Sequence, residues 1–590
     1  MLKVLNKINE PKDLKGLSME ELNTLAEEIR EGLFNRLTKI GGHFGPNFGF
    51  VEATIALHYV FNSPVDKFVF DVSHQTYPHK MLTGRKAGYI EEEHFHDVSG
   101  YSNPEESEHD FFTIGHTSTS ISLASGLAKA RDLKGDKENI IAVIGDGSLS
   151  GGEALEGLDF AGSELNSNFI IVVNDNQQSI AENHGGLYKN LKELRDGNGV
   201  AKTNIFTAMG LDYIYEKEGN NIEKLIEVFK KVKDIDHPIV VHINTQKGKG
   251  YKLAEENKED WHWALPFNKD TGIPSIDFGN GENYLSLTSD LLLEKMQNDK
   301  TVVAVAAGVP TSFGFTKEKR EKAGKQFVDV GIAEEQAVAM ISGIAKNGGK
   351  PVFGTNATFI QRTYDQVSQD LCINNNPATI LLGYTSVTGL NDVTHLGIFA
   401  ISAFKNIPNL VILAPTNKKE YMTMLNWSIE QKEHPVMILI PGNGVIDDER
   451  DTETDYTNSI NKYKIEQLGE KVAIIPAGDF YQIGEKAVKL IEEKLGFKPT
   501  LINPRFLTGV DKEKLDSLKA NHELIITLED GIVSGGFGEM ISNFYGLDNI
   551  KVKNLGMNKE FYDRYDPNEL LENLGLTPEK IEKSVEELLK

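Results

Sequence analysis

Two polar side chains stand where two predicted strands end, and both carry oxygen atoms that suit a hard metal ion. Residues 140–145 and 169–173 are apolar runs with little alternation, which is typical of strands buried on both faces of a parallel sheet. Asp146 and Asn176 stand at their carboxyl ends. Because ligands bind outside the carboxyl ends of such strands, the two side chains are predicted to hold Mg²⁺ against a diphosphate. The alternative is two ordinary turns, since Gly-Asp-Gly and Asn-Asp-Asn both form turns readily.

Histidines scattered along the chain are the candidates for proton transfer, because an imidazole titrates near neutral pH, at about 6.5 when unperturbed. None has the i, i+4 spacing of a helical zinc site, so zinc is not expected. A lone histidine is more often a structural group than a catalyst, and that alternative stays open for each of them. The candidates are His43, His74, His116, His262 and His395.

Strands and helices alternate along the chain, which predicts an α/β protein of three tandem domains, each with a mostly parallel sheet flanked by helices. A capping box from Ser18 to Glu21 begins the first long helix. The predicted domains are residues 1–270, 285–450 and 468–590, with a linker at 266–286. Further strands are predicted near residues 301–307, 351–354, 378–383, 410–414, 435–440, 471–475 and 524–528.

The overall charge of the chain excludes two classes of partner. Its 590 residues carry a net charge of −25, whereas binding to nucleic acid or to an anionic membrane surface needs clustered Lys and Arg. No apolar run reaches the roughly 18 residues of a membrane span. The single cysteine, Cys372, cannot form an intrachain disulfide, and residues 1–7 lack an apolar signal core. We therefore expect a cytoplasmic protein that acts on small molecules.

Several motifs of the chain resemble the thiamine diphosphate (ThDP)-dependent transketolase group, and most closely its 1-deoxy-D-xylulose-5-phosphate synthase family. The Gly-Asp-Gly motif is followed about thirty residues later by Asn176, as in the ThDP signature. The likeness runs from about residue 5 to the C-terminus. The motifs that carry it are Gly-Gly-His-Phe at 41–44, Asp-Val-Ser-His-Gln-Thr-Tyr-Pro-His-Lys at 71–80, and the segments 114–120, 145–154 and 359–366.

This resemblance implies a ThDP- and Mg²⁺-dependent carboligase with a transketolase-like fold, active as a homodimer and serving isoprene biosynthesis. Its reaction would decarboxylate pyruvate and join the two-carbon unit to an aldehyde such as D-glyceraldehyde 3-phosphate. The catalytic residues implied are Glu334, which favours the reactive tautomer of the cofactor, and His43, His74 and His395. The metal ligands are Asp146, Asn176 and Gln178. The cofactor-binding residues implied are His74, Gly115, His116, Thr117, Gly147, Ser148, Asn176, Tyr251, Glu334 and Phe359.

The acceptor end of the chain departs from the family pattern. Arginines of the family hold the acceptor's phosphate where this chain has Tyr384, Leu439 and Gly442. Each charge-assisted phosphate contact contributes about 1.5–3 kcal/mol, so losing two weakens binding by about 10²- to 10⁴-fold. The residues that could replace the lost charge are Arg362, Lys405 and Arg505.

Two further positions of the acceptor end differ from the family. Asn391 replaces an aspartate in the turn before His395, and Asn356 replaces a tyrosine. The substrate-binding residues implied by the resemblance are Arg362, His262, Tyr384 and Asn391.

Other functions stay open at this point. They are a transketolase-like transfer of a ketol group, a synthase-like reaction on an unphosphorylated aldehyde, a component of a 2-oxo-acid dehydrogenase, and a binding protein without activity. The resemblance also leaves two places for the cofactor: between the first two domains of one chain, or between subunits.

Overall fold

The computed structural model describes residues 2–276 and 281–590, which form two compact units. Unit 1 comprises residues 1–280 with 331–333, and unit 2 comprises 281–330 with 334–590. Part of the predicted linker, 277–280, lies outside the described residues. Each unit is described by itself, and the predicted division into three domains stays a prediction.

Unit 1 is built around a five-stranded, fully parallel sheet with the strand order β2-β3-β4-β6-β5. The two predicted strands are confirmed as β3 and β4, and nearly every residue in them is buried. The strands are β2 (Lys67–Phe70), β3 (Ile140–Gly145), β4 (Phe169–Asp175), β5 (Asp212–Glu216) and β6 (Pro238–Asn244), with a separate antiparallel pair β1 (Gly42–His43) and β7 (Trp263–Ala264).

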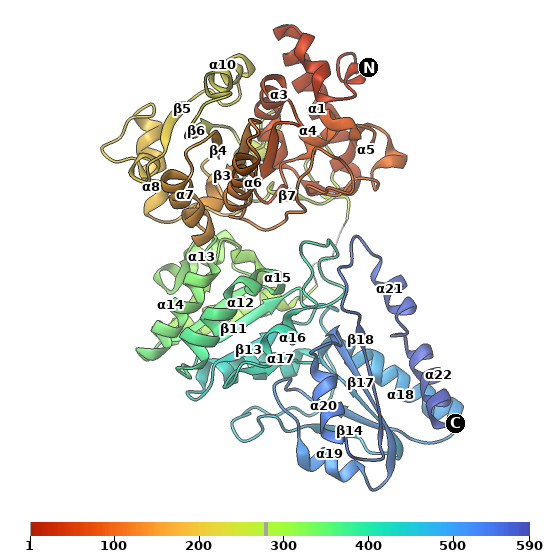
Figure 1. The fold of residues 1–590 in the computed structure, drawn as a ribbon. Helices are drawn as coiled ribbons and strands as arrows, with labels where there is room; N and C mark the ends of the chain where they lie inside the picture. Colours follow the sequence, from red (N-terminus) through yellow and green to blue (C-terminus); the bar gives the residue numbers. More distant parts are fainter. Residues whose placement is uncertain (1, 277–280) are drawn as a thin grey trace. The chain divides into compact units, whose positions relative to one another are not determined.

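Helices cover both faces of this sheet (Figure 1). Ile141 and Val143 of β3 pack with α1, α3 and α10, whereas Ile140 and Ile144 pack with α6, α7 and α8. Alternate residues of β3 therefore pack into the hydrophobic cores on opposite faces of the sheet, which is why the sequence of β3 is a continuous apolar run. The helices are α1 (Met19–Ile40), α3 (Val51–Val60), α6 (Ser120–Lys134), α7 (Gly152–Glu164), α8 (Gly186–Asp196) and α10 (Ile222–Val232).

The first long helix begins as predicted. Ser18 caps α1, because its hydroxyl accepts a hydrogen bond from the Glu21 amide while the Glu21 carboxylate accepts from the Ser18 amide. The short helices of unit 1 are α2 (Gly45–Gly49), α4 (Tyr77–Lys80), α5 (Ala87–Ile90), α9 (Ile205–Ala208) and α11 (Lys252–Glu256).

Unit 2 contains two sheets. The first is six-stranded and parallel, with the order β12-β13-β11-β10-β8-β9. The second is five-stranded with the order β14-β16-β15-β17-β18, and only its β14–β16 pair is antiparallel. The seven strands predicted in this region are all present. The first sheet has β8 (Val302–Ala306), β9 (Phe327–Asp329), β10 (Lys350–Asn356), β11 (Thr379–Gly383), β12 (Val411–Leu413) and β13 (Val436–Leu439). The second has β14 (Lys464–Gln467), β15 (Lys471–Pro476), β16 (Thr500–Asn503), β17 (His522–Ile532) and β18 (Lys551–Met557).

Helices flank both sheets of unit 2, so the α/β class is confirmed (Figure 1). The first of them, α12, begins at Tyr284 inside the predicted linker, because the Asn283 side chain caps it. No helix in the described part of the chain is both long and apolar enough to cross a bilayer. The helices are α12 (Tyr284–Asn298), α13 (Lys317–Ala323), α14 (Glu334–Lys346), α15 (Ala357–Ile360), α16 (Ala400–Phe404), α17 (Lys418–Glu430), α18 (Tyr481–Leu495), α19 (Lys512–Leu518), α20 (Phe537–Tyr545), α21 (Pro567–Asn573) and α22 (Pro578–Leu589).

Candidate functional site

The predicted metal ligands of unit 1 meet at the carboxyl ends of β3 and β4. The two strands pair in parallel, so Asp146 and Asn176 emerge side by side, and the Asn176 amide lies 3.5 Å from Asp146 Oδ1. The side-chain oxygen of Asn176 is buried without a hydrogen-bond partner. A buried carbonyl oxygen left unpaired is costly, so this pair of oxygens is suited to an added cation.

The electrostatics around Asp146 also favour a cation at this place. Burial, and then the nearby charge of Asp175, raise the pKa of Asp146 to about 7. Asp175 itself stays ionised, because hydrogen bonds from His242 and Arg195 outweigh the effect of burial and hold its pKa below the usual range. A cation beside Asp146 would therefore offset a negative charge that burial and Asp175 make unfavourable.

Two neighbours of the pair differ in how they are held. Gln178 uses its amide nitrogen to bond the Ile180 carbonyl, 3.2 Å away, and its role as a metal ligand stays a prediction. Asn183, which sequence reasoning missed, donates to Asp146 Oδ2 at 2.6 Å. Its position seven residues beyond Asn176 carries no recognisable motif.

Three of the predicted histidines of unit 1 lie together. The His43 ring lies 5.1 Å from His74 and 5.8 Å from His262, and the His74 and His262 rings are 5.2 Å apart. The short β1–β7 pair brings this about, because it sets His43 opposite Trp263. The sequence separates these residues by more than two hundred positions, and the fold gathers them into one cluster.

Lys247 is a further site residue that sequence reasoning missed. It is 2% exposed, and its ammonium donates to the Ser179 carbonyl at 2.5 Å and lies 3.0 Å from His262 Nδ1. Burial lowers the pKa of Lys247 to about 7 despite the opposing charge of Asp146. Burial, and then this lysine, also lower the pKa of His262 well below its usual value. Lys247 therefore interacts with both Asp146 and His262, and no motif at its place three residues after β6 marks it as a site residue.

The predicted cofactor loop, Gly115 to Ser118, is anchored to the ends of two strands. Asp71, at the end of β2, accepts hydrogen bonds from the Ser118 and Ser120 amides at 2.8 and 3.0 Å. The Ser118 hydroxyl bonds the Ser148 carbonyl at 2.8 Å. The loop with His116 and Thr117 is thus held against the turn that carries Gly147 and Ser148, as a shared binding role requires.

Tyr251 lies in different surroundings from the other predicted cofactor residues. Its ring packs among Phe34, Phe44, Trp261 and Phe267, and its hydroxyl donates to the Lys269 carbonyl at 2.8 Å. Its recorded contacts are therefore with this aromatic cluster, and the predicted role in cofactor binding stays a prediction.

In unit 2, Glu334 begins α14 and is 2% exposed. Burial raises the pKa of Glu334 to about 7, although the Arg362 guanidinium, 3.3 Å away, opposes the shift. A carboxyl group that keeps its proton near neutral pH can donate a hydrogen bond to a ring nitrogen. The structure thus places Arg362, predicted to bind substrate, beside the predicted catalytic carboxyl.

His395 and Phe359 also lie together in unit 2. Their rings are 5.7 Å apart at 82°. His395 Nδ1 lies 2.8 Å from the Thr394 hydroxyl and 3.5 Å from Asp392 Oδ1. Burial opposes the charge of Asp392, but bonds from His395 and Thr394 hold its pKa below the usual range. Asp392, missed by sequence reasoning, is the carboxylate that faces the histidine.

The remaining predicted substrate residues occupy loops at the carboxyl ends of the first sheet of unit 2. Asn391 donates to the Tyr565 carbonyl at 2.8 Å and so ties its loop to the C-terminal segment. Tyr384 follows β11 with φ of +54° and is 42% exposed. Gly442 follows β13, and its amide donates to Asp479 Oδ2 at 2.8 Å. An acidic side chain thus lies beside the glycine that replaces one of the arginines of the resembled family.

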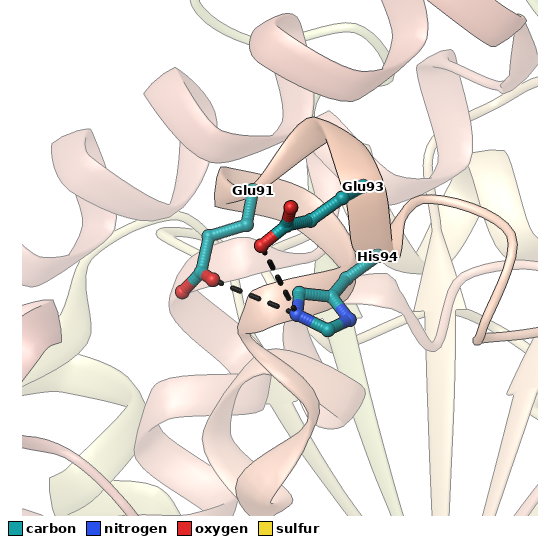
Figure 2. A group of neighbouring side chains, drawn as sticks. All are labelled: Glu91, Glu93 and His94. Carbon is teal, nitrogen blue, oxygen red and sulfur yellow. Dashed lines mark ion pairs between the residues drawn. The ribbon is translucent and has the colours of Figure 1, made fainter.

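One cluster elsewhere in unit 1 has metal-ligating side chains. Figure 2 shows Glu91 and Glu93 around His94, with both carboxylates 3.7 Å from His94 Nε2. Asp97 bonds the other ring nitrogen at 2.7 Å. The acidic partners are exposed and raise the pKa of His94, the nearest of them, Asp97, most of all. These contacts describe a solvated ion-pair group, not a metal centre.

Comparison with known proteins covers nearly the whole chain. Residues 5–204 and 197–245 match the family model of 1-deoxy-D-xylulose-5-phosphate synthase, residues 283–444 the transketolase pyrimidine binding domain, and residues 461–581 the transketolase C-terminal domain. Among solved structures, a transketolase from Leishmania mexicana aligns over 97% of both chains at 15% identity, with a TM-score of 0.44.

Curated relatives of similar length share more than a third of the sequence. The 1-deoxy-D-xylulose-5-phosphate synthase of Clostridium botulinum (strain Alaska E43) is 37% identical over 99% of both chains. Those of Clostridium beijerinckii and Clostridium perfringens (strain SM101) are also 37% identical, over the full length of both chains. The chain therefore belongs to the 1-deoxy-D-xylulose-5-phosphate synthase family of ThDP-dependent transferases.

Proposed function

We propose that this protein is a Mg²⁺- and ThDP-dependent carboligase that decarboxylates pyruvate and joins the two-carbon unit to an aldehyde. The observation that carries the proposal is Glu334, a buried carboxyl group at the start of α14 with its pKa raised to about 7. A protonated acid in this position suits the cofactor's ring nitrogen, and the names of the relatives point to the same reaction.

The residues of unit 1 fit the cofactor's metal and diphosphate. Asp146, Asn176 and Gln178 would hold Mg²⁺, and the unpaired buried oxygen of Asn176 supports this assignment. The loop 115–118 and the turn with Gly147 and Ser148 would hold the diphosphate. Bound ThDP supplies a nucleophilic carbon and an electron sink for decarboxylation.

The protein's own groups would then bind the cofactor, hold protons and move them. Glu334 would hold a proton at its carboxyl group, in surroundings that burial keeps dry. His43, His74 and His395 would accept and return protons at the reacting oxygens, since imidazole does this near neutral pH. Burial, and then the charge of Lys247, would keep His262 neutral, and a neutral imidazole can accept a hydrogen bond from a substrate hydroxyl.

The metal assignment is tested by binding, without turnover. Asp146→Asn removes a ligand charge at nearly constant shape, so Mg²⁺-dependent ThDP binding, followed by calorimetry, should weaken by at least about 10-fold. The matched control is Asp159→Asn on the exposed side of α7, which should bind as the wild type does. Equal affinity of the Asp146 variant and the control would remove the metal site.

The reaction itself is tested by CO₂ release from pyruvate in the presence of ThDP, Mg²⁺ and an aldehyde. Release that depends on both cofactors supports the proposal. A loaded protein that releases no CO₂, but transfers ketol groups from ketose donors, would replace it by a transketolase-like function.

We also propose that the active form is a homodimer, as the family resemblance implies. Light scattering should then give a mass twice the 65.5 kDa of one chain. A monomer with full activity would contradict this proposal.

A further inference from the structure

Loops from four strands of unit 2 meet around the turn of Tyr384. β11 and β13 are parallel neighbours in the first sheet, and β15 and β17 are parallel neighbours in the second. The turn of Tyr384 packs directly against the loop of His395, since a Cβ on Gly397 would lie 2.0 Å from the Tyr384 carbonyl oxygen. Groups around this turn are therefore close to a predicted catalytic histidine.

Asp479, from the end of β15, occupies the space beside Gly442. Its Oδ2 accepts the Gly442 amide at 2.8 Å, and its main-chain carbonyl accepts the Asn443 side chain at 3.1 Å. A Cβ on Gly442 would lie 3.3 Å from this carboxylate and 3.4 Å from the Cβ of Ser386. The carboxylate thus stands in the place toward which a side chain at residue 442 would grow.

Asp530, from the irregular end of β17, is the second carboxylate of the group. Its Oδ1 accepts a hydrogen bond from the Val387 amide at 2.8 Å. Its Oδ2 has no hydrogen-bond partner, and the residue as a whole is buried, with 8% of its surface exposed. Asp479 and Asp530 both line a cavity of about 20 Å³, room for roughly one water molecule or one hydroxyl group. The unpaired oxygen and the cavity together indicate a missing hydrogen-bond donor.

Neutral polar groups complete the surroundings. The Ser386 hydroxyl lies 2.9 Å from that of Thr388, which donates to Asn443 Oδ1 at 3.0 Å. Ser386 lowers the pKa of both carboxyl groups, although burial raises each of them more strongly. Asn356, 7% exposed, has a buried amide oxygen without a partner, and a Cβ on Gly383 would lie 3.6 Å from it. Acceptors for hydroxyl protons therefore line both sides of the turn.

Cations that could offset the carboxylates are engaged elsewhere. In the described part of the chain, no ion pair joins Asp479 or Asp530 to a lysine or arginine. Arg362 lies beside Glu334. Arg505 is 3% exposed, pairs with Glu453 at 3.0 Å and donates to the Lys462 carbonyl. The charge of Lys405 acts on Glu529. Arg362 and Arg505 thus have other partners, and the charge of Lys405 acts on a different carboxyl group.

We propose that Asp479 and Asp530, with Ser386 and Asn356, form an acceptor pocket for an uncharged, hydroxylated aldehyde and exclude a phosphorylated one. This inference rests on the proposed carboligase function and names its acceptor class. Hydroxyl groups of the acceptor donate to the two carboxylates and to the Asn356 oxygen. A phosphate group would meet like charge and no guanidinium, a juxtaposition that opposes binding.

The test compares two acceptors that differ only in the phosphate. CO₂ release from pyruvate is measured with the wild-type holoenzyme, with D-glyceraldehyde and with D-glyceraldehyde 3-phosphate, alongside release without acceptor. The expected result is a higher kcat/KM for the unphosphorylated aldehyde, because a phosphate would meet two carboxylates and no guanidinium. A preference for the phosphorylated aldehyde would overturn the inference and leave the proposed function standing. No release with either acceptor would overturn both.

Charge-neutral variants test the two carboxylates directly. Asp479→Asn and Asp530→Asn should each lower kcat/KM for glyceraldehyde about 10-fold and raise kcat/KM for glyceraldehyde 3-phosphate. The ratio of the two kcat/KM values should therefore fall. Asp516→Asn, an exposed residue of α19 paired with Lys519, is the matched control and should keep the wild-type preference. Release without acceptor should stay at the wild-type level in the Asp516→Asn control. A uniform loss with both acceptors in the two pocket variants would mean a structural role for the carboxylates and overturn the inference.

Discussion

Glu334 shows how burial alone prepares a side chain for acid chemistry. The pKa of the glutamate rises to about 7, because loss of water, helped by the charge of Glu335, outweighs the attraction of the Arg362 guanidinium. The folded protein therefore holds a proton that the unfolded chain releases near pH 4.5. Such a group lowers stability progressively as the pH rises between the two values.

The first prediction concerns the stability of the ligand-free protein. Glu334→Gln removes the titrating group. The free energy of unfolding of the variant should therefore rise relative to that of the wild type between pH 4.5 and 7, by up to roughly 3 kcal/mol at pH 7 and above. Melting temperatures of both proteins across this pH range are the measurement. Glu321→Gln, an exposed residue of α13, is the control and should follow the wild type. A difference independent of pH would contradict the raised pKa.

The same substitution makes a prediction about catalysis. An amide cannot supply the carboxyl proton, so we expect turnover to fall by at least about 10²-fold with the fold intact. Steady-state CO₂ release and circular dichroism give the two readings. Activity within a few-fold of the wild type would refute the role assigned to Glu334.

At the scale of the elements, the turn after β2 organises the cofactor loop. Val72 and Ser73 adopt left-handed backbone angles, with φ of 58° and 64°, which is unfavourable for a β-branched residue such as valine. Asp71, directly before them, accepts the amides of Ser118 and Ser120 at the start of α6. The carboxylate that fixes the loop therefore belongs to the residue that begins the strained turn.

Asp71→Asn is expected to loosen that loop. One amide proton of the new side chain would face a backbone N–H, which costs about 1–3 kcal/mol. Hydrogen exchange of residues 114–121 should speed up by about 10- to 100-fold, while the strands β3 and β4 stay protected. The control is Asp97→Asn, whose partner His94 is on the surface. Unchanged exchange in the loop would mean that Asp71 does not hold it.

The strands and loops also show which parts of the structure can be predicted from the sequence. β3 and β4 were predictable because continuous apolar runs mark strands with two buried faces, and Asp146 and Asn176 at their ends followed from parallel topology. Lys247 and Asp530 were not predictable. Lys247 meets His262 only through the packing of two loops, and Asp530 stands where the register of β17 shifts between Leu528 and Ile532. Such positions depend on the backbone path, which residue types do not specify.

At the scale of the whole molecule, the net charge of −25 should slow the encounter with anionic substrates. The screening length falls from about 30 Å at 0.01 M salt to about 10 Å at 0.1 M. We therefore expect kcat/KM for pyruvate to rise roughly two- to fivefold over this range, and that for an uncharged aldehyde to stay constant. Steady-state kinetics at several salt concentrations test this. A fall with added salt for pyruvate would show that local positive charge governs its approach.

The two acceptor-pocket carboxylates accept hydrogen bonds from main-chain amides of the neighbouring loops. Asp479 accepts the Gly442 amide and Asp530 accepts the Val387 amide. An amide proton is present whatever side chain a residue carries, proline excepted. The loops can therefore exchange side chains without loosening this junction. Position 384 is accordingly suited to randomisation in a directed-evolution library, where new acceptors could be selected while these two main-chain bonds stay in place.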